Sequence, residues 1–491
     1  MIKNFIKDIA KYLPAQIVPA IVGIVSIPII TRLFPPEDYG NYILVMATIG
    51  VLSTFVGWLS MSIIRFYPIY EKDRKLGQFY ANIIKLSIIS IGIISLIFST
   101  ILLFTKSYIS SDLYFLMWIG ILIFILTSFF EILLHFLRVK RQVTWYSGFI
   151  IWESITRIGF AMLLIIVFNF GIIGLFWGSI LSLTIVLPFL WKKGIGKVSL
   201  RSNISMPLTL EMARYSFPLL VGNLAAWILS LSDRFVLNFF RGSQEVGIYS
   251  ASYAISERSI MLLGMLFLLA WGPISINIWE NEGAEKSQEF VSKVTRYYLI
   301  ACFPAIIGLS VLARPVIRIL TAQEYYEGYR IIPLVALGAF FLGFQQMFQA
   351  GLIFYKKTNF VMYSIIASGL LNLGLNYLFI PQYGYMAAAL TTLISYIFLL
   401  FLMIIVSRRF FVWEFPFKSL GNVVCASGVM GIIVYYIGNS LTSSTLLSLI
   451  IGIIVGVVVY LLMLFLLREI RPSKIQAVLD LKNQIFAKKK L

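Results

Sequence analysis

The stretch Tyr215–Tyr249, YSFPLLVGNLAAWILSLSDRFVLNFFRGSQEVGIY, is long and apolar enough to cross a bilayer, and yet it contains Asp233 and Arg234. A charge at mid-span costs about 2.5–3.5 kcal/mol on insertion scales, so intramembrane charges usually face a bundle interior or a water-filled cavity. On a helix, Asn223, Arg234 and Asn238 fall on one narrow stripe. The stretch therefore predicts a membrane helix whose polar face lines a transport path or makes a structural pair with a neighbouring helix.

The composition of the whole chain agrees with this prediction. The chain is 60% hydrophobic and 12% charged, with a mean hydropathy of +0.91, far from a soluble globular protein. Apolar runs of about 20 residues recur, which is typical of a helical membrane protein. We expect an all-α membrane protein with about 14 transmembrane helices, near residues 12–33, 41–64, 79–104, 114–137, 146–168, 171–191, 214–239, 248–273, 296–313, 331–354, 359–380, 384–406, 419–438 and 445–467.

The net charge of +19 would suggest a nucleic-acid partner in a soluble protein, but its distribution indicates membrane topology. If the N-terminus is cytoplasmic, most lysines and arginines fall on the cytoplasmic side, as the positive-inside rule requires. We therefore expect a multi-pass protein of the cytoplasmic membrane with both termini inside, no nucleic-acid partner, and contact of the basic C-terminal tail with anionic membrane lipids.

The second half of the chain repeats features of the first. Each half opens with an aromatic residue and a proline, carries a late arginine, and continues with a Gly-x-Tyr motif, at Gly40-Asn41-Tyr42 and Gly247-Ile248-Tyr249. Six crossings precede the polar linker, so the two lobes would be related by an axis along the membrane normal. We predict an N-terminal lobe at 1–191, a cytoplasmic linker at 192–212, a C-terminal lobe at 213–406, two accessory helices at 407–467 and a basic cytoplasmic tail at 468–491.

Several cations lie within the predicted spans. Arg157 follows Glu153 by one helical turn, so a structural ion pair competes with a functional role, and Lys85 and Arg65 lie close enough to the cytoplasmic ends to snorkel. Guanidinium groups at depth would form an electropositive cavity, and their forks suit the oxygens of a diphosphate headgroup. The candidate cationic residues are Arg157, Arg234, Arg258, Lys85, Arg65 and Arg32.

Uncharged polar residues form a second group of candidates. Asn372 and Asn376 are spaced i, i+4 in an apolar span, and Thr391 and Thr392 follow in the next. With Asp233 they offer oxygen ligands that suit a small hard cation, although interhelical hydrogen bonds would explain them equally well. The candidates for a polar path that could carry sugar hydroxyls are Asn223, Gln345, Gln346 and Gln349.

Signals for an enzyme are poor. The one histidine, His135, lies one turn from Glu131 near the inner end of a span, where a packing or hydrogen-bonding role is the more common one. No Asp-x-Asp pair or glycine-rich phosphate loop is present, and Cys302 and Cys425 form no metal-binding spacing. We therefore expect neither catalysis nor a cofactor, and no metal beyond a Na⁺ ion at the polar group.

Three motifs carry a resemblance to a known family. Ser232-Asp233-Arg234-Phe235 through Tyr249, Asn372-Leu373-Gly374-Leu375-Asn376 through Gly384, and Arg32-Leu33-Phe34 with Tyr39-Gly40-Asn41-Tyr42 resemble the polysaccharide-export (O-antigen-type) flippases of the multidrug/oligosaccharidyl-lipid/polysaccharide exporter superfamily. The resemblance implies a V-shaped, two-lobed helical fold. It also implies alternating access that moves undecaprenyl-diphosphate-linked oligosaccharides to the outer leaflet for lipopolysaccharide or exopolysaccharide synthesis.

The resemblance also implies a coupling ion. Related lipid II flippases bind Na⁺ through a pattern that falls here on Asp233, Asn372, Asn376, Ala388 and Thr392. The second carboxylate of that pattern is Asn376 in this chain, which removes one negative charge and leaves H⁺ coupling through Asp233 open beside Na⁺.

Other readings of the sequence remain open. A drug exporter of the same fold would favour carboxylates for organic cations, and a polytopic polysaccharide polymerase would need a large outer loop that this chain lacks. A scaffold in a glycan-assembly complex is the third alternative. For a flippase, the expected partners are the lipid-linked oligosaccharide, a polysaccharide polymerase and chain-length proteins.

Overall fold

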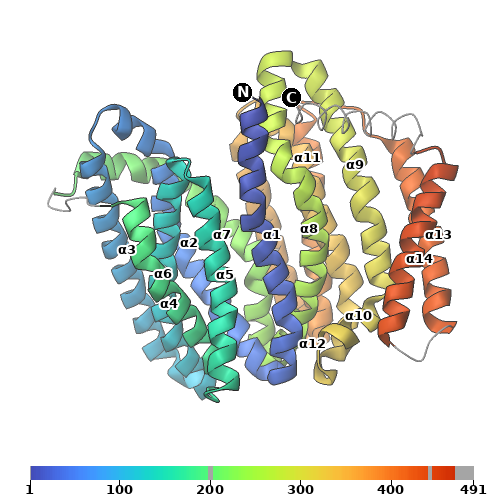
Figure 1. Cartoon of the computed structure of the whole chain (residues 1–491), viewed down its shortest axis with the longest axis horizontal. Helices are drawn as coiled ribbons and strands as arrows, with labels where there is room; N and C mark the ends of the chain where they lie inside the picture. The colour runs from blue at the N-terminus through green and yellow to red at the C-terminus, as the bar shows by residue number, and fades with distance from the viewer. Residues whose placement is uncertain (1, 197–202, 441–444, 470–491) are drawn as a thin grey trace, which may run out of the picture. The chain divides into compact units, whose positions relative to one another are not determined.

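The computed structural model describes residues 2–196, 203–440 and 445–469, and these form helices without any strand, as predicted (Figure 1). Part of the predicted linker, 197–202, and the predicted tail from residue 470 onward lie outside the described residues. The elements are α1 (Ile2–Leu33), α2 (Pro36–Lys72), α3 (Leu76–Thr105), η1 (Lys106–Tyr108), α4 (Ser111–Val139), α5 (Val143–Ile166), α6 (Ile173–Gly194), α7 (Met206–Arg241), α8 (Ser243–Glu282), α9 (Ala284–Val311), α10 (Ala313–Leu320), η2 (Gln323–Ile331), α11 (Ile332–Phe354), α12 (Thr358–Ser407), α13 (Phe417–Ser440) and α14 (Thr445–Leu466).

Twelve helical segments of the described chain are long and apolar enough to cross a membrane. Two of the predicted spans, 359–380 and 384–406, lie in the single helix α12, which is interrupted at Gly384 by a backbone φ of 56°. Because a positive φ is easily adopted only by glycine, this residue marks the junction of the two spans. The predicted span 248–273 lies within α8, which is not among the twelve.

The chain divides into two compact units, and the division runs through α8 and α12. Unit 1 contains residues 1–254 and 361–395, and unit 2 contains residues 255–360 and 396–491. Unit 1 therefore holds α1–α7 together with the first part of α8 and the middle of α12. The lobe boundaries predicted from the sequence follow chain order and stay a prediction.

In unit 1, α2 packs against both α4 and α7, and α5 packs against both α1 and α6. Figure 1 shows α2–α6 running up and down beside one another, joined by short turns. Arg74 and Arg141 adopt positive φ angles in two of these turns. A hydrogen bond of 2.8 Å between the hydroxyls of Ser62 and Ser216 fastens α2 to α7. Such bonds satisfy polar groups that lipid cannot.

The repeated Gly-x-Tyr motifs meet at a close helix crossing. A Cβ on Gly40 would collide with the carbonyl oxygen of Ser243, and a Cβ on Gly247 would collide with the carbonyl oxygen of Pro36. Each glycine thus contacts the residue four positions before the other glycine. Copies of one motif related by a two-fold axis make reciprocal contacts of this kind, so the sequence repeat has a counterpart in the packing.

Unit 2 has an aromatic core and a buried carboxylate. The Tyr298 hydroxyl donates to the Phe340 carbonyl at 2.9 Å, joining α9 to α11. Glu469 accepts from Arg296 at 2.6 Å, Ser419 at 2.7 Å and Asn422 at 2.8 Å. Burial raises the pKa of Glu469, but these three donors outweigh it and hold the pKa below its ordinary value.

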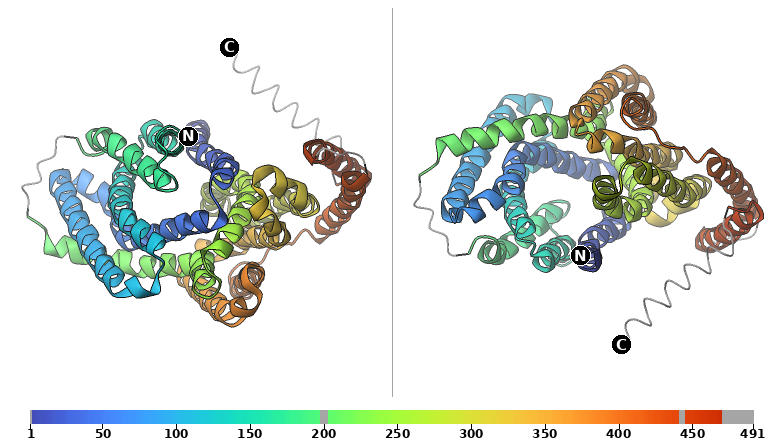
Figure 2. Two further views of the ribbon diagram at one scale, coloured as in Figure 1. Left: turned by 90° about the horizontal axis from the view of Figure 1, so that it is seen from below. Right: turned by 90° about the horizontal axis from the view of Figure 1, so that it is seen from above.

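The last two helices border an apolar groove in unit 2. Helices α13 and α14 pack on each other and against α9, and Figure 2 shows the pair side by side. The groove has a volume of about 380 Å³ and is lined mainly by aliphatic residues of α9 and α14. Tyr460, one of its few polar residues, donates to the Ile300 carbonyl at 2.7 Å. The groove surface is therefore almost entirely apolar.

Candidate functional site

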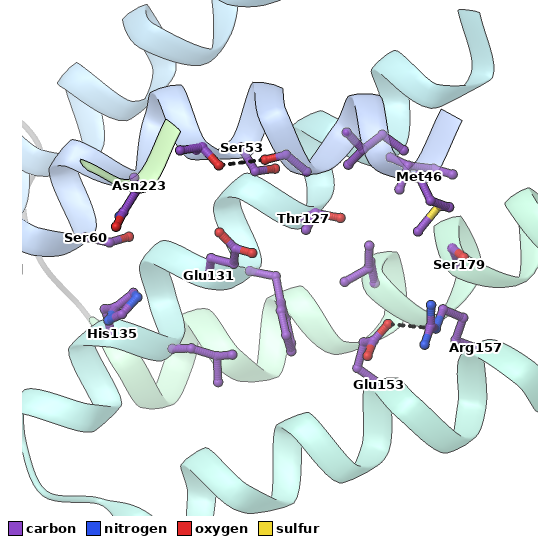
Figure 3. A pocket seen from close by; sticks show the side chains of 18 of the residues that line it. Met46, Ser53, Ser60, Thr127, Glu131, His135, Glu153, Arg157, Ser179 and Asn223 are labelled. Atoms are coloured by element: carbon purple, nitrogen blue, oxygen red, sulfur yellow. Dashed lines mark hydrogen bonds and ion pairs between the residues drawn. The ribbon is translucent and has the colours of Figure 1, made fainter. Parts of the chain in front are cut away.

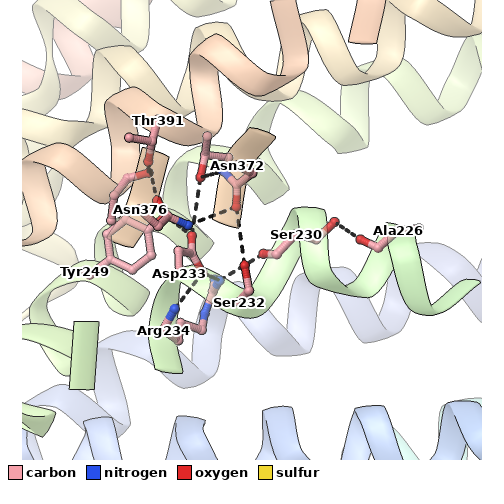
Figure 4. Close-up of polar contacts among 11 residues, drawn as sticks. Ala226, Ser230, Ser232, Asp233, Arg234, Tyr249, Asn372, Asn376 and Thr391 are labelled. Atoms are coloured by element: carbon pink, nitrogen blue, oxygen red, sulfur yellow. Dashed lines mark hydrogen bonds and ion pairs between the residues drawn. The ribbon is translucent and has the colours of Figure 1, made fainter. Parts of the chain in front are cut away.

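The charged residues of α7 lie inside unit 1 and are paired with each other. Asp233 is 1% exposed and Arg234 is 6% exposed. Nη1 of Arg234 donates to Oδ1 of Asp233 at 2.9 Å and to the Ser230 carbonyl at 3.1 Å (Figure 4). The backbone N–H of Arg234 donates to the same Oδ1 at 2.8 Å. The two opposite charges therefore neutralise each other where water does not reach.

Helix α8 supplies two tyrosines to this pair. The Tyr249 hydroxyl donates to Oδ2 of Asp233. The guanidinium of Arg234 lies over the Tyr253 ring, 4.7 Å from its centroid, and 5.4 Å from that of Tyr249. Cation–π contacts of this kind gain strength when they are desolvated. The hydrogen-bond donor and the aromatic faces hold both charges in place.

Helix α12 completes the polar group with two fully buried asparagines. Nδ2 of Asn376 donates to Oδ1 of Asn372 at 2.9 Å, and the Thr391 hydroxyl donates to Oδ1 of Asn376. The Ser232 hydroxyl donates to Oδ1 of Asn372 at 3.3 Å, and the Thr392 hydroxyl donates to Oδ2 of Asp233 at 3.5 Å. We call this group the Asp233 cluster; it consists of Ser232, Asp233, Arg234, Tyr249, Asn372, Asn376, Thr391 and Thr392.

The Asp233 cluster brings together the residues of the predicted Na⁺ site, but their oxygen atoms are already engaged. Both carboxylate oxygens of Asp233 and the side-chain oxygens of Asn372 and Asn376 accept hydrogen bonds, as described above. The Ala388 carbonyl accepts from Thr391 at 3.1 Å. The positive charge is supplied by Arg234, so this arrangement does not fit a bound Na⁺. The Na⁺ site implied by the resemblance stays a prediction, and this arrangement of hydrogen bonds does not support it.

A separate cavity of about 680 Å³ lies within unit 1, between α2, α4, α5, α6 and α7 (Figure 3). This volume is within the range of small-molecule sites. The cavity is polar for a membrane-spanning bundle, because hydroxyl and amide side chains line it. They include Ser53, Ser60, Thr127, Ser179 and Asn223.

Four ionisable side chains line this unit 1 cavity: Glu131 and His135 from α4, and Glu153 and Arg157 from α5. Nε of Arg157 lies 3.2 Å from Oε1 of Glu153, and the two side chains are 27% and 22% exposed. This Nε makes no hydrogen bond among the described residues, so the pair is an ion pair by distance only. The Arg157 guanidinium lines the cavity, its Nε is buried, and it also contacts the Tyr42 hydroxyl of α2.

Glu131 and His135 lie one turn apart on the cavity face of α4, as Figure 3 shows. The Glu131 side chain is exposed to the cavity, and in the described part of the chain it has neither an ion pair nor a hydrogen bond. Nδ1 of His135 is buried and likewise has no hydrogen-bond partner there. The sequence predicted a packing or hydrogen-bonding role for His135 and no role for Glu131, although their i, i+4 spacing placed them on one helix face.

The structure distributes the predicted cationic residues over several places. Arg157 and the predicted path residue Asn223 line the unit 1 cavity, whereas Arg234 belongs to the Asp233 cluster. The other predicted cationic candidates in unit 1 lie on α1, α2 and α3 outside this cavity lining; they are Arg32, Arg65 and Lys85.

The remaining candidates belong to unit 2. Arg258 lies on α8, and Gln345 and Gln349 lie on α11. Gln345 is buried, and its Oε1 has no hydrogen-bond partner among the described residues. A single cationic cavity that gathers all the predicted arginines stays a prediction.

Known proteins are similar to this chain along most of its length. A family described as polysaccharide biosynthesis protein matches residues 5–279, and the MatE family matches residues 218–378. An uncharacterized membrane protein of Methanocaldococcus jannaschii is 22% identical over 476 residues, which are 91% of this chain and 92% of the relative.

Two groups of solved structures share the fold. The lipid II flippase MurJ in an inward closed conformation superposes with a TM-score of 0.74 at 18% identity, covering 93% of this chain and 98% of MurJ. An inward-facing multidrug resistance MATE transporter of the MOP superfamily gives a TM-score of 0.60 at 14% identity, covering 81% and 97%. At these identities the likeness establishes the fold alone.

Proposed function

Because the chain belongs to the polysaccharide biosynthesis protein family of the MOP superfamily, we propose that it is a flippase for undecaprenyl-diphosphate-linked oligosaccharides. It would carry these lipids from the inner to the outer leaflet of the cytoplasmic membrane during cell-surface polysaccharide synthesis. MurJ is named as a flippase for lipid II, and its fold covers 93% of this chain. This likeness supports a lipid-linked substrate.

The observation that carries the proposal is the unit 1 cavity with Arg157 at its wall. A polar cavity of about 680 Å³ within a membrane-spanning bundle can hold a hydrophilic headgroup that lipid excludes. The Arg157 guanidinium lines this cavity, and guanidinium groups suit bidentate binding of phosphate oxygens. Hydroxyl and amide side chains around it offer hydrogen bonds to sugar hydroxyls.

Unit 2, taken by itself, has an apolar groove that suits a hydrocarbon chain. Its lining of aliphatic residues from α9, α13 and α14 matches the chemistry of a polyprenyl chain, which has no polar group to satisfy. We assign the headgroup to the cavity of unit 1. Alternating access would then expose the headgroup to each side of the membrane in turn.

The remaining parts of the proposal concern topology and partners. Both chain termini would face the cytoplasm, since this orientation places most basic residues inside. A polysaccharide polymerase, with its chain-length proteins, would consume the lipid-linked units on the outer side. Translocation needs no covalent chemistry, so the proposal assigns no catalytic residue.

The test is to replace the chromosomal gene with Arg157→Glu, which places a third carboxylate in the cavity. We expect surface polysaccharide to be lost while lipid-linked intermediates accumulate on the cytoplasmic side. Lys286→Glu is the matched charge reversal, because Lys286 is 60% exposed on α9, and it should display polysaccharide normally. Normal display by Arg157→Glu at wild-type protein levels would contradict the proposal.

One observation favours a second candidate, the export of organic cations. The unpartnered carboxylate of Glu131 in the cavity is a group that a cationic drug would select. In that case Glu131→Gln would abolish ethidium efflux, while surface polysaccharide would not depend on this protein. Absence of any ethidium efflux by the wild-type protein would exclude this candidate.

A further inference from the structure

We propose that Glu131 and His135 form a proton-binding site that admits the anionic headgroup to the unit 1 cavity. The inference rests on the proposed flippase function and identifies the ion that binds with the substrate. The ligand of the new site is H⁺. The acceptor atoms are the carboxylate oxygens of Glu131 and a ring nitrogen of His135.

The geometry provides two proton acceptors at one place. The side chains lie one turn apart on the cavity face of α4 and both line the cavity. Glu131 has no cation beside it and no hydrogen bond among the described residues, so no partner of this chain fixes its carboxylate in the ionised form. Nδ1 of His135, buried and unbonded there, can hold a proton without breaking an existing hydrogen bond.

The charge of the cavity makes protonation necessary for an anionic ligand. With Glu131 ionised and His135 neutral, the two carboxylates of the cavity face a single guanidinium, so the lining carries one net negative charge. A diphosphate would be repelled. Protonation of Glu131 makes the lining neutral, and protonation of His135 as well makes it positive. The sign of the cavity charge therefore depends on these two groups.

The neighbouring charges on the packed elements leave Glu131 as the main proton acceptor, because the nearby cation Arg138 disfavours a proton on His135. Helix α5 contributes Glu153 and Arg157, which offset each other. The Tyr42 hydroxyl of α2 contacts Arg157, and Arg138 of α4 acts on His135 from outside the cavity lining. The cavity residues from α2, α6 and α7 are uncharged. Only Glu131 and His135 can thus change the charge of the lining without breaking an ion pair.

The Asp233 cluster also contains a carboxylate in unit 1, but the oxygens of this carboxylate already accept hydrogen bonds from the chain. Oδ1 of Asp233 accepts from Arg234, and Oδ2 accepts from Tyr249 and Thr392. A proton on Asp233 would compete with the guanidinium for the same oxygen. Glu131 has no such competitor, so the cavity is the site where a proton can be exchanged with water.

The proton moves without any bond change in the substrate. Glu131 takes a proton from water when the headgroup enters, and it returns the proton to water when the headgroup leaves. The headgroup and the proton that binds with it together carry less negative charge than the headgroup alone. An inside-negative membrane potential still favours outward movement as long as the headgroup brings more negative charge than the protons offset.

The experiment measures binding of geranylgeranyl diphosphate to the full-length protein in lipid nanodiscs between pH 5.5 and pH 8. The ligand itself titrates, so the informative quantity is the ratio of Kd values for wild type and Glu131→Gln at each pH. We expect a ratio near 1 at pH 5.5. At pH 8 we expect a ratio on the order of tenfold, because a carboxylate within about 8 Å repels the ligand. Glu289→Gln, an exposed change on α9, should follow the wild type.

A second readout is the uptake of protons on ligand addition in weakly buffered solution at pH 7.5. The wild type should take up more protons than Glu131→Gln, and His135→Gln should reduce the uptake in part. A constant Kd ratio with equal proton uptake would overturn the proton site but leave the flippase proposal standing. Absence of diphosphate binding at every pH, with ethidium binding that Glu131→Gln abolishes, would overturn both.

Discussion

Two of the acid–arginine pairs in unit 1 have different surroundings. Asp233 and Arg234 are buried, and both oxygens of Asp233 accept hydrogen bonds from this chain. Glu153 and Arg157 face a cavity, and the Arg157 Nε–H has no acceptor among the described residues. A buried pair with all its partners holds helices together, whereas a partly exposed pair that lines a cavity is available to a ligand. An intramembrane charge is therefore a candidate for function where it lines a cavity.

The largest effect on stability is expected when the buried Asp233–Arg234 ion pair is broken. Asp233→Asn leaves the Arg234 guanidinium buried without its counter-charge, which should cost about 3–5 kcal/mol of stability. The thermal unfolding midpoint of the detergent-solubilised protein would fall by many degrees. The double variant Asp233→Asn, Arg234→Gln removes both charges and should recover most of the loss. Equal midpoints for wild type and Asp233→Asn would show that the pair does not stabilise the fold.

Glu469 in unit 2 extends the comparison, because its carboxylate also accepts hydrogen bonds from this chain. Glu469→Ala removes the acceptor of Arg296, Ser419 and Asn422 and should cost about 2 kcal/mol. Since the folded-state pKa of Glu469 is depressed, its contribution is present above the ordinary glutamate pKa and is lost as the pH falls through the folded value. Melting curves between pH 7 and pH 3 should therefore converge for wild type and variant. A gap that stays constant with pH would contradict this account.

The Glu153–Arg157 ion pair, which lines the cavity, should be much less important for stability. Glu153→Gln breaks an ion pair that water in the cavity already screens, so the expected change is within about 1 kcal/mol. The same melting assay would detect it beside Asp233→Asn. If Glu153→Gln were as destabilising as Asp233→Asn, the distinction between a structural and an available pair would fail.

The smallest effect is expected from Na⁺. Because the oxygens of the Asp233 cluster are engaged and Arg234 supplies the positive charge, exchanging KCl for NaCl at constant ionic strength should not raise the unfolding midpoint. A bound ion at 100 times its Kd would add about 2.7 kcal/mol, which is easily measured. A saturable, Na⁺-specific rise that Asp233→Asn removes would restore the predicted Na⁺ site.

Much of the fold could be predicted from the sequence, because apolar runs of membrane length report directly on helices in lipid. The all-α fold and the superfamily were predicted correctly. The repeated Gly40 and Gly247 motifs also anticipated a real feature, since only glycine permits the close crossing between the starts of α2 and α8.

The site was harder to predict because helical periodicity gives a residue's face but not what that face meets. Arg234 and Asp233 are adjacent in sequence, where helix geometry normally turns side chains apart, yet tyrosines from α8 and hydroxyls from α12 hold them together. The spacing of Glu131 and His135 placed them on one helix face, but nothing in the sequence indicated that this face borders a cavity. Their environment depends on α5, the next helix in the chain, and on α2 and α7, which lie far away in the chain.

The most direct test of the central claim is the affinity of the full-length protein in nanodiscs for geranylgeranyl diphosphate at pH 5.5, compared between wild type and Arg157→Gln. Loss of a charged hydrogen-bond donor should weaken binding by about tenfold or more. Glu153→Gln, which removes the opposite charge of the same pair, should leave binding unchanged or strengthen it. Equal affinity of wild type and Arg157→Gln would contradict the assignment of the headgroup to this cavity.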